Sequence, residues 1–184
     1  MAKKPAARKT SPKRRVSFKR PKPAPETGPW LIEVAYKSQR YDPAGNALAK
    51  AIKDVDPKAV LKPRVSHLYI LDETLSAKDA QLAAQELLED PILQTSEIHS
   101  MEKARSARIK APIVDVWLKP GVTDVVAETI QQGLKDFNIE GARARSGTRY
   151  AFPGLKNADI LKTIAKNFLT NPLIHEYYIQ SSNS

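Results

Sequence analysis

A pattern that occurs twice constrains the fold of this chain more than any other feature. Residues 112–134 alternate apolar and polar residues, break at Lys119-Pro120-Gly121 and continue with helical spacing. Alternation is typical of a strand and the wider spacing of a helix, so this stretch predicts strand, turn and helix. The same order occurs 82 positions earlier, from Ile32 to Ile52. The chain is therefore expected to contain two similar units.

The first unit begins with a strand and a helix. Residues 30–37 alternate well enough for a strand, with Ile32, Val34 and Tyr36 as inward positions. Asp42-Pro43 then starts a helix, because Asp can cap the free first-turn amides and Pro at the first helical position loses no hydrogen bond. The helix should run to about Val55 and end at Asp56-Pro57. Its expected inward stripe is Ala44, Leu48, Ile52 and Val55.

The rest of the first unit predicts another strand, a second helix and a last strand. Residues 59–72 read as extended, either as two short strands or as one bent strand. Ser76 caps the second helix with Asp79 three residues on, an arrangement like a capping box. Asp90-Pro91 ends that helix, and residues 92–98 form the last strand. The inward residues of the second helix are Ala80, Ala83, Ala84 and Leu87.

The second unit follows the first with one change of register. The offset is 82 through the first helix, and it becomes 81 after a single-residue deletion between Phe137 and Tyr150. The matched helix stripe is Val126, Ile130, Leu134 and Phe137. The later matched pairs are Tyr69 with Tyr150, the cap Ser76 with the cap Asn157, and Pro91 with Pro172. A single gap is enough to align the two units over their whole length. Chance similarity would not readily produce such an alignment.

These elements predict an α+β fold of two tandem units. Each unit is expected to be an antiparallel sheet with two helices on one face, and the two are expected to pack as a pseudo-dimer within one chain. A unit of about 70 residues buries a limited core alone, so the units should pack on each other or on a partner. The predicted parts are a tail at 1–28, units at 29–98 and 112–180, a polar linker at 99–111 and a C-terminal tail at 181–184.

The net charge of +10 is concentrated at the N-terminus. Residues 1–28 carry ten Lys or Arg and one acidic residue, Glu26, so the rest of the chain is nearly neutral. Five prolines and few large apolar side chains prevent this tail from burying enough surface to offset its loss of entropy, so we expect it to be disordered. It is either a solubilising extension or a polyanion-binding segment whose affinity falls with salt.

Composition excludes several classes of protein. No run approaches the roughly 18 apolar residues of a membrane span, and the N-terminus lacks the apolar segment of a secretory signal. We therefore expect a soluble, cytoplasmic protein. The absence of cysteine excludes disulfides, thiolate metal sites and cysteine nucleophiles.

The sequence contains no constellation typical of catalysis, cofactor binding or metal binding. His67, His99 and His175 are far apart and have no ligand spacing nearby. No metalloprotease, serine hydrolase or P-loop motif is present. We therefore assign no catalytic residue, no cofactor and no metal to this chain.

Three smaller features have ordinary structural interpretations. The basic cluster Arg143, Arg145, Ser146-Gly147 and Arg149 is either an anion-binding turn or, as we favour, a hairpin turn whose arginines face solvent. Asp42 and Asp124 hold matched places, which helix capping explains. Trp117 and Tyr36 lie on predicted strands, where core or inter-unit packing is favoured over base stacking.

Three segments together resemble a known family. They read V-D-V-W-L-K-P-G-V-T-D-V-V-A-E-T-I, then R-Y-A-F, then N-F-L-T-N-P-L-I-H-E-Y-Y-I. In this order and spacing they resemble the small PurS-type subunit of phosphoribosylformylglycinamidine synthase, an enzyme of purine biosynthesis. The first unit resembles it more loosely, through V-A-Y-K, D-P-A-G, L-Y-I-L and E-L-L-E-D-P-I-L. The resemblance covers about residues 30–180 and leaves the tail outside.

The resemblance implies a function without catalytic residues of its own. The small subunit pairs into a dimer and bridges a large ATP-dependent synthetase to a glutaminase, so that ammonia released from glutamine reaches formylglycinamide ribonucleotide. Some longer synthetase chains carry a related region at their N-terminus. Here two PurS-like units would form the pseudo-dimer, which should be monomeric when alone. The candidate partner interface is Lys119, Pro120, Gly121, Asp124, Arg149 and Tyr150.

Two other functions stay open. A nucleic-acid-associated α+β module would bind through the basic tail, with an affinity that falls steeply with salt. A small-molecule regulatory module would need a ligand pocket between the two units.

Overall fold

The computed structural model describes residues 28–58, 61–72, 75–155 and 159–181. The first half runs in the order β1 (Trp30–Tyr36), the 3-10 turn η1 (Gln39–Tyr41), α1 (Pro43–Val55), β2 (Arg64–Leu71), α2 (Ala77–Ala83), the π-helical turn η2 (Ala84–Leu88) and β3 (Gln94–Ser100). In the second half the order is β4 (Ile113–Leu118), α4 (Val125–Asp136), β5 (Ala144–Ala151), α5 (Ile160–Ile164), the π-helical turn η3 (Ala165–Leu169) and β6 (His175–Gln180). A short helix, α3 (Met101–Ser106), lies between the halves.

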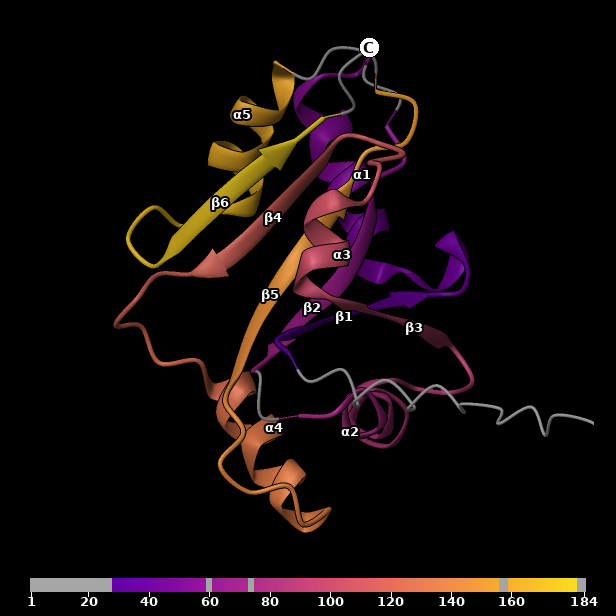
Figure 1. The fold of residues 1–184 in the computed structure, drawn as a ribbon. Helices are drawn as coiled ribbons and strands as arrows, with labels where there is room; N and C mark the ends of the chain where they lie inside the picture. The colour runs from indigo at the N-terminus through magenta and orange to yellow at the C-terminus, as the bar shows by residue number, and fades with distance from the viewer. Residues whose placement is uncertain (1–27, 59–60, 73–74, 156–158, 182–184) are drawn as a thin grey trace, which may run out of the picture.

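All six strands form one antiparallel sheet in the order β3-β1-β2-β5-β4-β6. We expected each unit to have a sheet of its own, and in this respect the prediction was wrong. Strand β2 pairs with β5 along its whole length, from Arg64 opposite Ala151 to Leu71 opposite Ala144. This pairing gives the backbone groups of both strand edges a partner, so the halves share a continuous sheet. Figure 1 shows β2 and β5 side by side in its middle.

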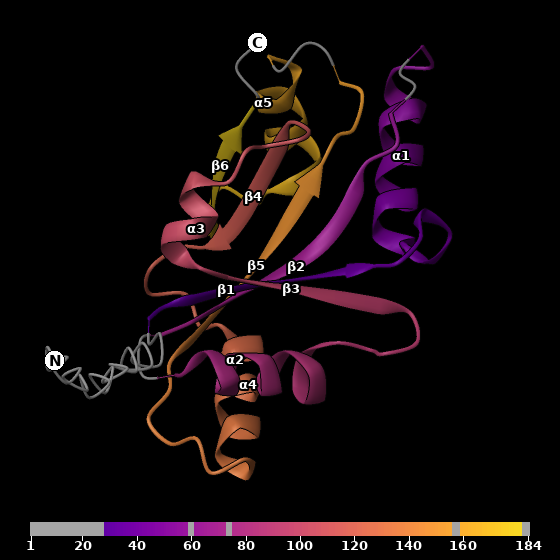
Figure 2. The same ribbon diagram turned by 45° about the vertical axis from the view of Figure 1, so that its right-hand side comes forward.

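The helices α1, α2, α4 and α5 cover one face of this sheet, as the α+β prediction requires (Figures 1 and 2). One core lies over β1 and includes Ile32 and Val34 with the alanines of α2 and η2. The other lies over β4 and includes Val114 and Val116 with the apolar residues of α5 and η3. Because strand side chains alternate between faces, the inward positions predicted for the first strand are the ones that face the helices.

Each core also contains a helix from the other half. Leu48 and Ile52 of α1 belong to the core over β4. Ile130 and Leu134 of α4 belong to the core over β1. Neither core is therefore complete within one half of the chain.

The other face of the sheet, here called the open face, carries a smaller apolar cluster. Leu31, Leu68 and Trp117 are buried there, and Met101 and Ala104 of α3 pack against them. The sequence predicted a linker without an apolar stripe at 99–111. Instead, the start of this segment belongs to β3, and α3 uses two apolar residues one turn apart to cover part of the open face.

The predicted starts of the helices are confirmed where the structure describes them. Asp42 and Asp124 cap α1 and α4, and Ser76 forms a capping box with Asp79. The inward stripes were predicted correctly in the middle of each helix and wrongly at its ends, where Ala44 is exposed. Val55 is 74% exposed, whereas Gly45 is buried beside Leu48 and Ile52. In α4, Ala127, Ile130 and Leu134 are buried, while Val126 in the first turn and Phe137 after the last residue are exposed. At the N-terminal end of both helices the buried face starts at the residue whose N–H donates to the capping aspartate, one position after the predicted one.

Two further differences concern strands. Residues 61–72, the described end of the segment predicted as extended, contain a single strand, β2. Strand β3 starts at Gln94, because residues 90–93 form a hydrogen-bonded turn.

The predicted cap Asn157 and the basic tail, apart from Gly28, lie outside the described residues. No helix in the described ranges is long and apolar enough to cross a membrane.

Candidate functional site

The turn Lys119-Pro120-Gly121 joins β4 to α4 and leaves Pro120 and Gly121 exposed. The backbone N–H of Lys119 donates to the carbonyl oxygen of Ile174 at 2.9 Å, and its Nζ donates to that of Pro172 at 2.5 Å. Gly121 has φ +88°, a conformation that favours glycine. The lysine thus ties this turn to the turn that precedes β6, and the two turns form one exposed surface.

The first half has the same connection with different turn residues. The N–H of Lys37 donates to the carbonyl oxygen of Leu93 at 3.0 Å, and its Nζ donates to that of Pro91 at 2.6 Å. After Lys37 the chain forms η1 instead of an open Pro-Gly turn. Both lysines therefore have a structural role, and the halves differ in what they expose beside it.

Asp42 and Asp124 each connect a helix to the following strand. Asp42 is fully buried and accepts hydrogen bonds from the N–H groups of Gly45 at 2.7 Å and Val65 at 2.8 Å. Asp124 is partly exposed and accepts from the N–H of Ala127 at 2.9 Å, the N–H of Ser146 at 2.7 Å and the Ser146 hydroxyl at 2.8 Å. Helix capping therefore accounts for both carboxylates, as predicted.

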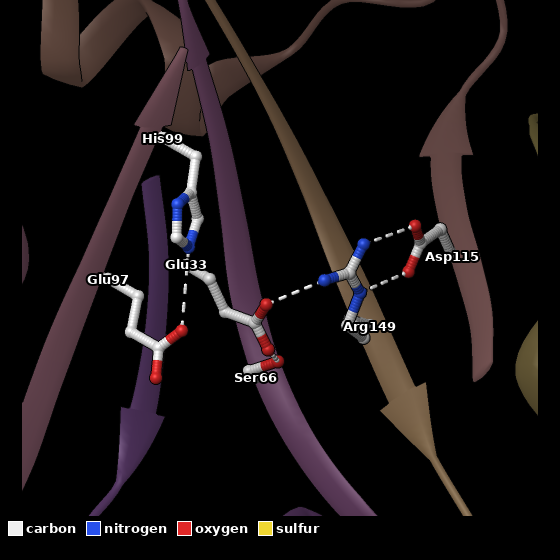
Figure 3. A network of polar contacts seen from close by, with 6 residues as sticks. All are labelled: Glu33, Ser66, Glu97, His99, Asp115 and Arg149. Atoms are coloured by element: carbon white, nitrogen blue, oxygen red, sulfur yellow. Dashed lines mark hydrogen bonds and ion pairs between the residues drawn. The ribbon is translucent and has the colours of Figure 1, made fainter. Parts of the chain in front are cut away.

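Arg149 lies at the centre of a polar network on the open face (Figure 3). Its Nε and Nη2 donate to the two carboxylate oxygens of Asp115 at 2.7 and 2.8 Å. Its Nη1 donates to Glu33 at 2.6 Å, and Glu33 also accepts from the Ser66 hydroxyl at 2.6 Å. The network joins β1 and β2 of the first half to β5 and β4 of the second.

The two carboxylates hold the Arg149 guanidinium firmly in its charged form. Burial alone would lower the pKa of Arg149, but hydrogen bonds and opposite charges from Asp115 and Glu33 outweigh it and raise the pKa above its ordinary value. Only 19% of the Arg149 side chain is exposed, and the Asp115 side chain is 7% exposed. Such a group stabilises the sheet more readily than it binds a ligand.

The structure separates the six candidate interface residues. Lys119, Pro120, Gly121 and Asp124 lie together at the turn after β4. Arg149 and Tyr150 are neighbours on β5, so their side chains point to opposite faces of the sheet. Tyr150 packs against the helix-side core over β4, where burial raises its pKa.

The basic cluster around Arg149 was predicted to be a turn, and this prediction was wrong. Residues 144–151 form strand β5, because they pair with β2 on one side and with β4 on the other. The Arg145 guanidinium lies 5.3 Å from the centre of the Trp117 ring and 3.3 Å from Glu176. A Cβ on Gly147 would come within 2.6 Å of that ring, so this glycine makes room for Trp117. Trp117 therefore serves packing, as predicted.

Sequence reasoning missed Glu33 and Asp115. A signal was present, since these two acids are 82 positions apart and occupy matched places on β1 and β4. Their partner could not be recognised without knowing that β2 and β5 pair.

The described residues contain no group of three or more His, Asp or Glu that could hold a metal ion. His67, His99 and His175 lie on three different strands, β2, β3 and β6. In the described ranges every buried side-chain nitrogen or oxygen has a hydrogen-bond partner.

Comparison with known proteins identifies part of the chain. Residues 112–183 match the family PurS, described as phosphoribosylformylglycinamidine (FGAM) synthase. No curated protein and no solved structure matches the chain. The matched range begins just before β4 and includes every element of the second half, from β4 to β6. Residues 112–183 are therefore a PurS domain.

Proposed function

We propose that this chain is a non-catalytic bridging subunit of the phosphoribosylformylglycinamidine synthase complex in purine biosynthesis. It would assemble the large ATP-dependent synthetase with the glutaminase, in the cytoplasm, so that ammonia passes between them. The observation that carries this proposal is the match of residues 112–183 to the PurS family. The exposed turn of that domain supports a role in binding partners.

We further propose that residues 29–98 are a second PurS-like unit, joined through residues 99–111 to the unit at 112–180. The two halves share the order strand, helix, strand, helix and strand, and both second helices end in a π-helical turn. The capping carboxylates and the turn lysines also make equivalent contacts. On this proposal the chain is an internal pseudo-dimer and is monomeric when alone.

Within the candidate interface we propose different roles for the six residues. Lys119, Pro120 and Gly121 would contact a partner, because the last two are exposed. Asp124 would position this turn through the start of α4, while Arg149 and Tyr150 would act by stabilising β5.

Reconstitution tests the function directly. The large subunit and the glutaminase are mixed with and without this chain, and glutamine-dependent formation of phosphoribosylformylglycinamidine is measured. We expect activity to depend on the chain and a complex of all three to elute together. Activity that is equal in both mixtures, with no complex, would refute the proposal.

One observation favours a second function, nucleic-acid binding through the tail. Nine of the ten net positive charges belong to residues 1–28. In that case DNA or RNA binding should fall steeply with salt and disappear when residues 1–28 are removed, while the reconstituted activity stays unchanged. Binding that survives this truncation would place any nucleic-acid site elsewhere.

A further inference from the structure

A hollow on the open face lies between α3 and the sheet, and we call it the α3 pocket. Its volume is about 510 Å³, within the roughly 300–1,000 Å³ that is usual for small-molecule sites. Helix α3 contributes Met101, Ala104 and Arg105 to its lining, and strands from both halves contribute the rest. Figure 1 shows α3 in front of the sheet, against which it packs. The pocket is therefore formed jointly by the two halves and the helix between them.

The α3 pocket has an apolar floor. Leu31, Leu68 and Trp117 line it, and these three are the buried cluster of the open face. Tyr178 also lines the pocket and is 54% exposed, so its ring is available to a ligand. A ligand with a flat apolar part would gain free energy by burying that part here.

The charged groups that line the α3 pocket are mostly positive. Three arginines line it, and Asp115 is the one carboxylate among the described residues that does so. Both oxygens of Asp115 already accept from Arg149. Glu33 and Glu176 contact Arg149 and Arg145, but they line neighbouring hollows and not this one. Figure 3 shows Arg149 between Glu33 and Asp115. The pocket thus favours an anion.

The other two arginines have donors to spare. Nη2 of Arg145 makes two contacts of 3.3 Å, with Glu176 and with the carbonyl oxygen of Leu118. Its Nη1 and Nε have no acceptor in the described ranges, and 52% of the side chain is exposed. Arg105 has no hydrogen-bond or ion-pair partner in the same ranges. Two guanidinium groups, one from α3 and one from β5, can therefore bind one anion.

The repeated scaffold does not account for the α3 pocket, because the first half lacks its side chains. The matched pairs are Trp117 with Ala35, Arg149 with Leu68, and Tyr178 with Glu97. The aromatic rings and the central cation therefore belong to the second half alone, and the first half has an acid at one of these positions. The asymmetry predicts one such site in each chain.

We propose that the α3 pocket binds one small organic phosphate with a flat aromatic body, the chemical class of the nucleoside monophosphates. A phosphate has acceptor oxygens that point in three directions, so it can accept from Arg105 and Arg145 at once. A planar carboxylate suits one arginine better than two from different elements. The aromatic body would lie on the apolar floor beside Tyr178. This site goes beyond the proposed bridging function and does not rest on it.

Calorimetric titration of the full chain with adenosine 5′-monophosphate (AMP) tests the site. The variants are Arg105→Gln and Arg145→Gln, and the matched control is Arg40→Gln, an exposed arginine outside the pocket. We expect one AMP per chain, with binding at least about 10-fold weaker in each pocket variant and unchanged in the control. The basic tail is the same in all four proteins, so binding by the tail would not distinguish them.

Two further comparisons test the two parts of the ligand. Adenosine, which lacks the phosphate, and ribose 5-phosphate, which lacks the base, should each bind the unaltered chain at least about 10-fold more weakly than AMP. A Tyr178→Ala variant should weaken AMP binding at least about 5-fold and leave ribose 5-phosphate binding unchanged. Thermal unfolding of the variants should stay close to that of the unaltered chain, because Arg105, Arg145 and Tyr178 are exposed.

Several outcomes would overturn the proposal. AMP that does not bind, or that binds all the arginine variants equally, would show that the α3 pocket is not a phosphate site. Ribose 5-phosphate that binds as tightly as AMP would overturn the aromatic body. The reconstituted synthetase activity would not be affected by any of these results, so the bridging function would be judged separately.

Discussion

Arg149 and Leu68 hold matched positions, 81 residues apart, and give the open face two different sides. Arg149 binds acids from both halves, Glu33 and Asp115. Leu68 is fully buried against Leu31 and Trp117. The junction between β2 and β5 is therefore stabilised by an ionic network at one position and by apolar packing at the matched position.

Replacing Arg149 with leucine should destabilise the fold by about 3 kcal/mol, because it leaves the buried carboxylate of Asp115 without its partner. The free energy of unfolding, measured in urea, checks this expectation. In an Asp115→Asn background the same replacement should cost much less, since no buried charge is left unpaired. An equal loss in both backgrounds would contradict the assignment of the network as a charge pair.

His67 should make stability depend weakly on pH below neutrality, because its side chain is only partly desolvated and is still exposed to solvent. Desolvation lowers its pKa from the ordinary value of 6.5, although nearby Asp42 acts in the opposite direction. The unfolded chain therefore takes up this proton first as the pH falls below 6.5, and stability is lost as the pH approaches the folded pKa. Above 6.5 His67 is largely neutral in both states and contributes nothing.

A His67→Gln variant should accordingly lose less unfolding free energy than the unaltered chain when urea denaturation is moved from pH 7.5 to pH 5.5. The comparison between the two proteins removes the contributions of all other titrating groups. If both lose the same amount, His67 is not the source of the pH dependence.

At the scale of elements, the two capping aspartates offer a matched comparison. Asp42→Ala should cost about 3 kcal/mol, because it removes a helix cap and leaves the buried N–H of Val65 unsatisfied. Asp124→Ala should cost about 1–2 kcal/mol, since Asp124 and Ser146 are partly exposed and water can replace the lost bonds.

Urea unfolding of both variants measures the difference, and Asp56→Ala serves as the control. Asp56 is exposed and accepts one hydrogen bond, from Lys58, so its removal should change the unfolding free energy by no more than about 0.5 kcal/mol. Costs that are equal at positions 42 and 124 would show that burial does not set the strength of these caps.

The elements themselves could be predicted from the sequence because their signals are local. Asp42-Pro43 and Ser76 mark helix starts through bonds within one turn, and the alternation around Val34 marks a strand. The ends of the helix stripes could not be predicted, because Val55 and Phe137 have the right spacing but lie at the C-terminal ends of α1 and α4, where they are exposed. Helical periodicity predicts which side of a helix faces the sheet, but it does not predict where along the helix the contact with the sheet ends.

The polar network could not be predicted for a different reason. Arg149, Asp115 and Glu33 meet only because β2 pairs with β5 and aligns the two halves. That pairing depends on contacts between residues far apart in the chain, which a local pattern does not carry. The same is true of Arg145, which was placed in a turn because its basic neighbours on β5 lack a strand-like apolar alternation.

At the scale of the whole molecule, the two halves depend on each other, because α1 packs in the core of the second half and α4 packs in the core of the first half. Each core combines strands from one half with a helix from the other. A half on its own keeps its three strands but loses one helix from its core, and either β2 or β5 loses its partner strand. The intact chain should therefore unfold in a single cooperative step.

Residues 112–184 expressed alone should consequently form a homodimer through β5. Without the first half, the β5 edge is unpaired and Ile130 and Leu134 of α4 are uncovered. A second copy can pair with the β5 edge and cover these α4 residues, because β5 holds the position that matches β2. Each copy also brings Arg149 together with Asp115, so the charges at the new junction balance. Light scattering should give twice the fragment mass, while the full chain gives the mass of one chain. Adding residues 28–98 should convert this dimer into the mixed pair. A fragment that stays monomeric and unfolds cooperatively at the same temperature as the full chain would contradict the shared cores.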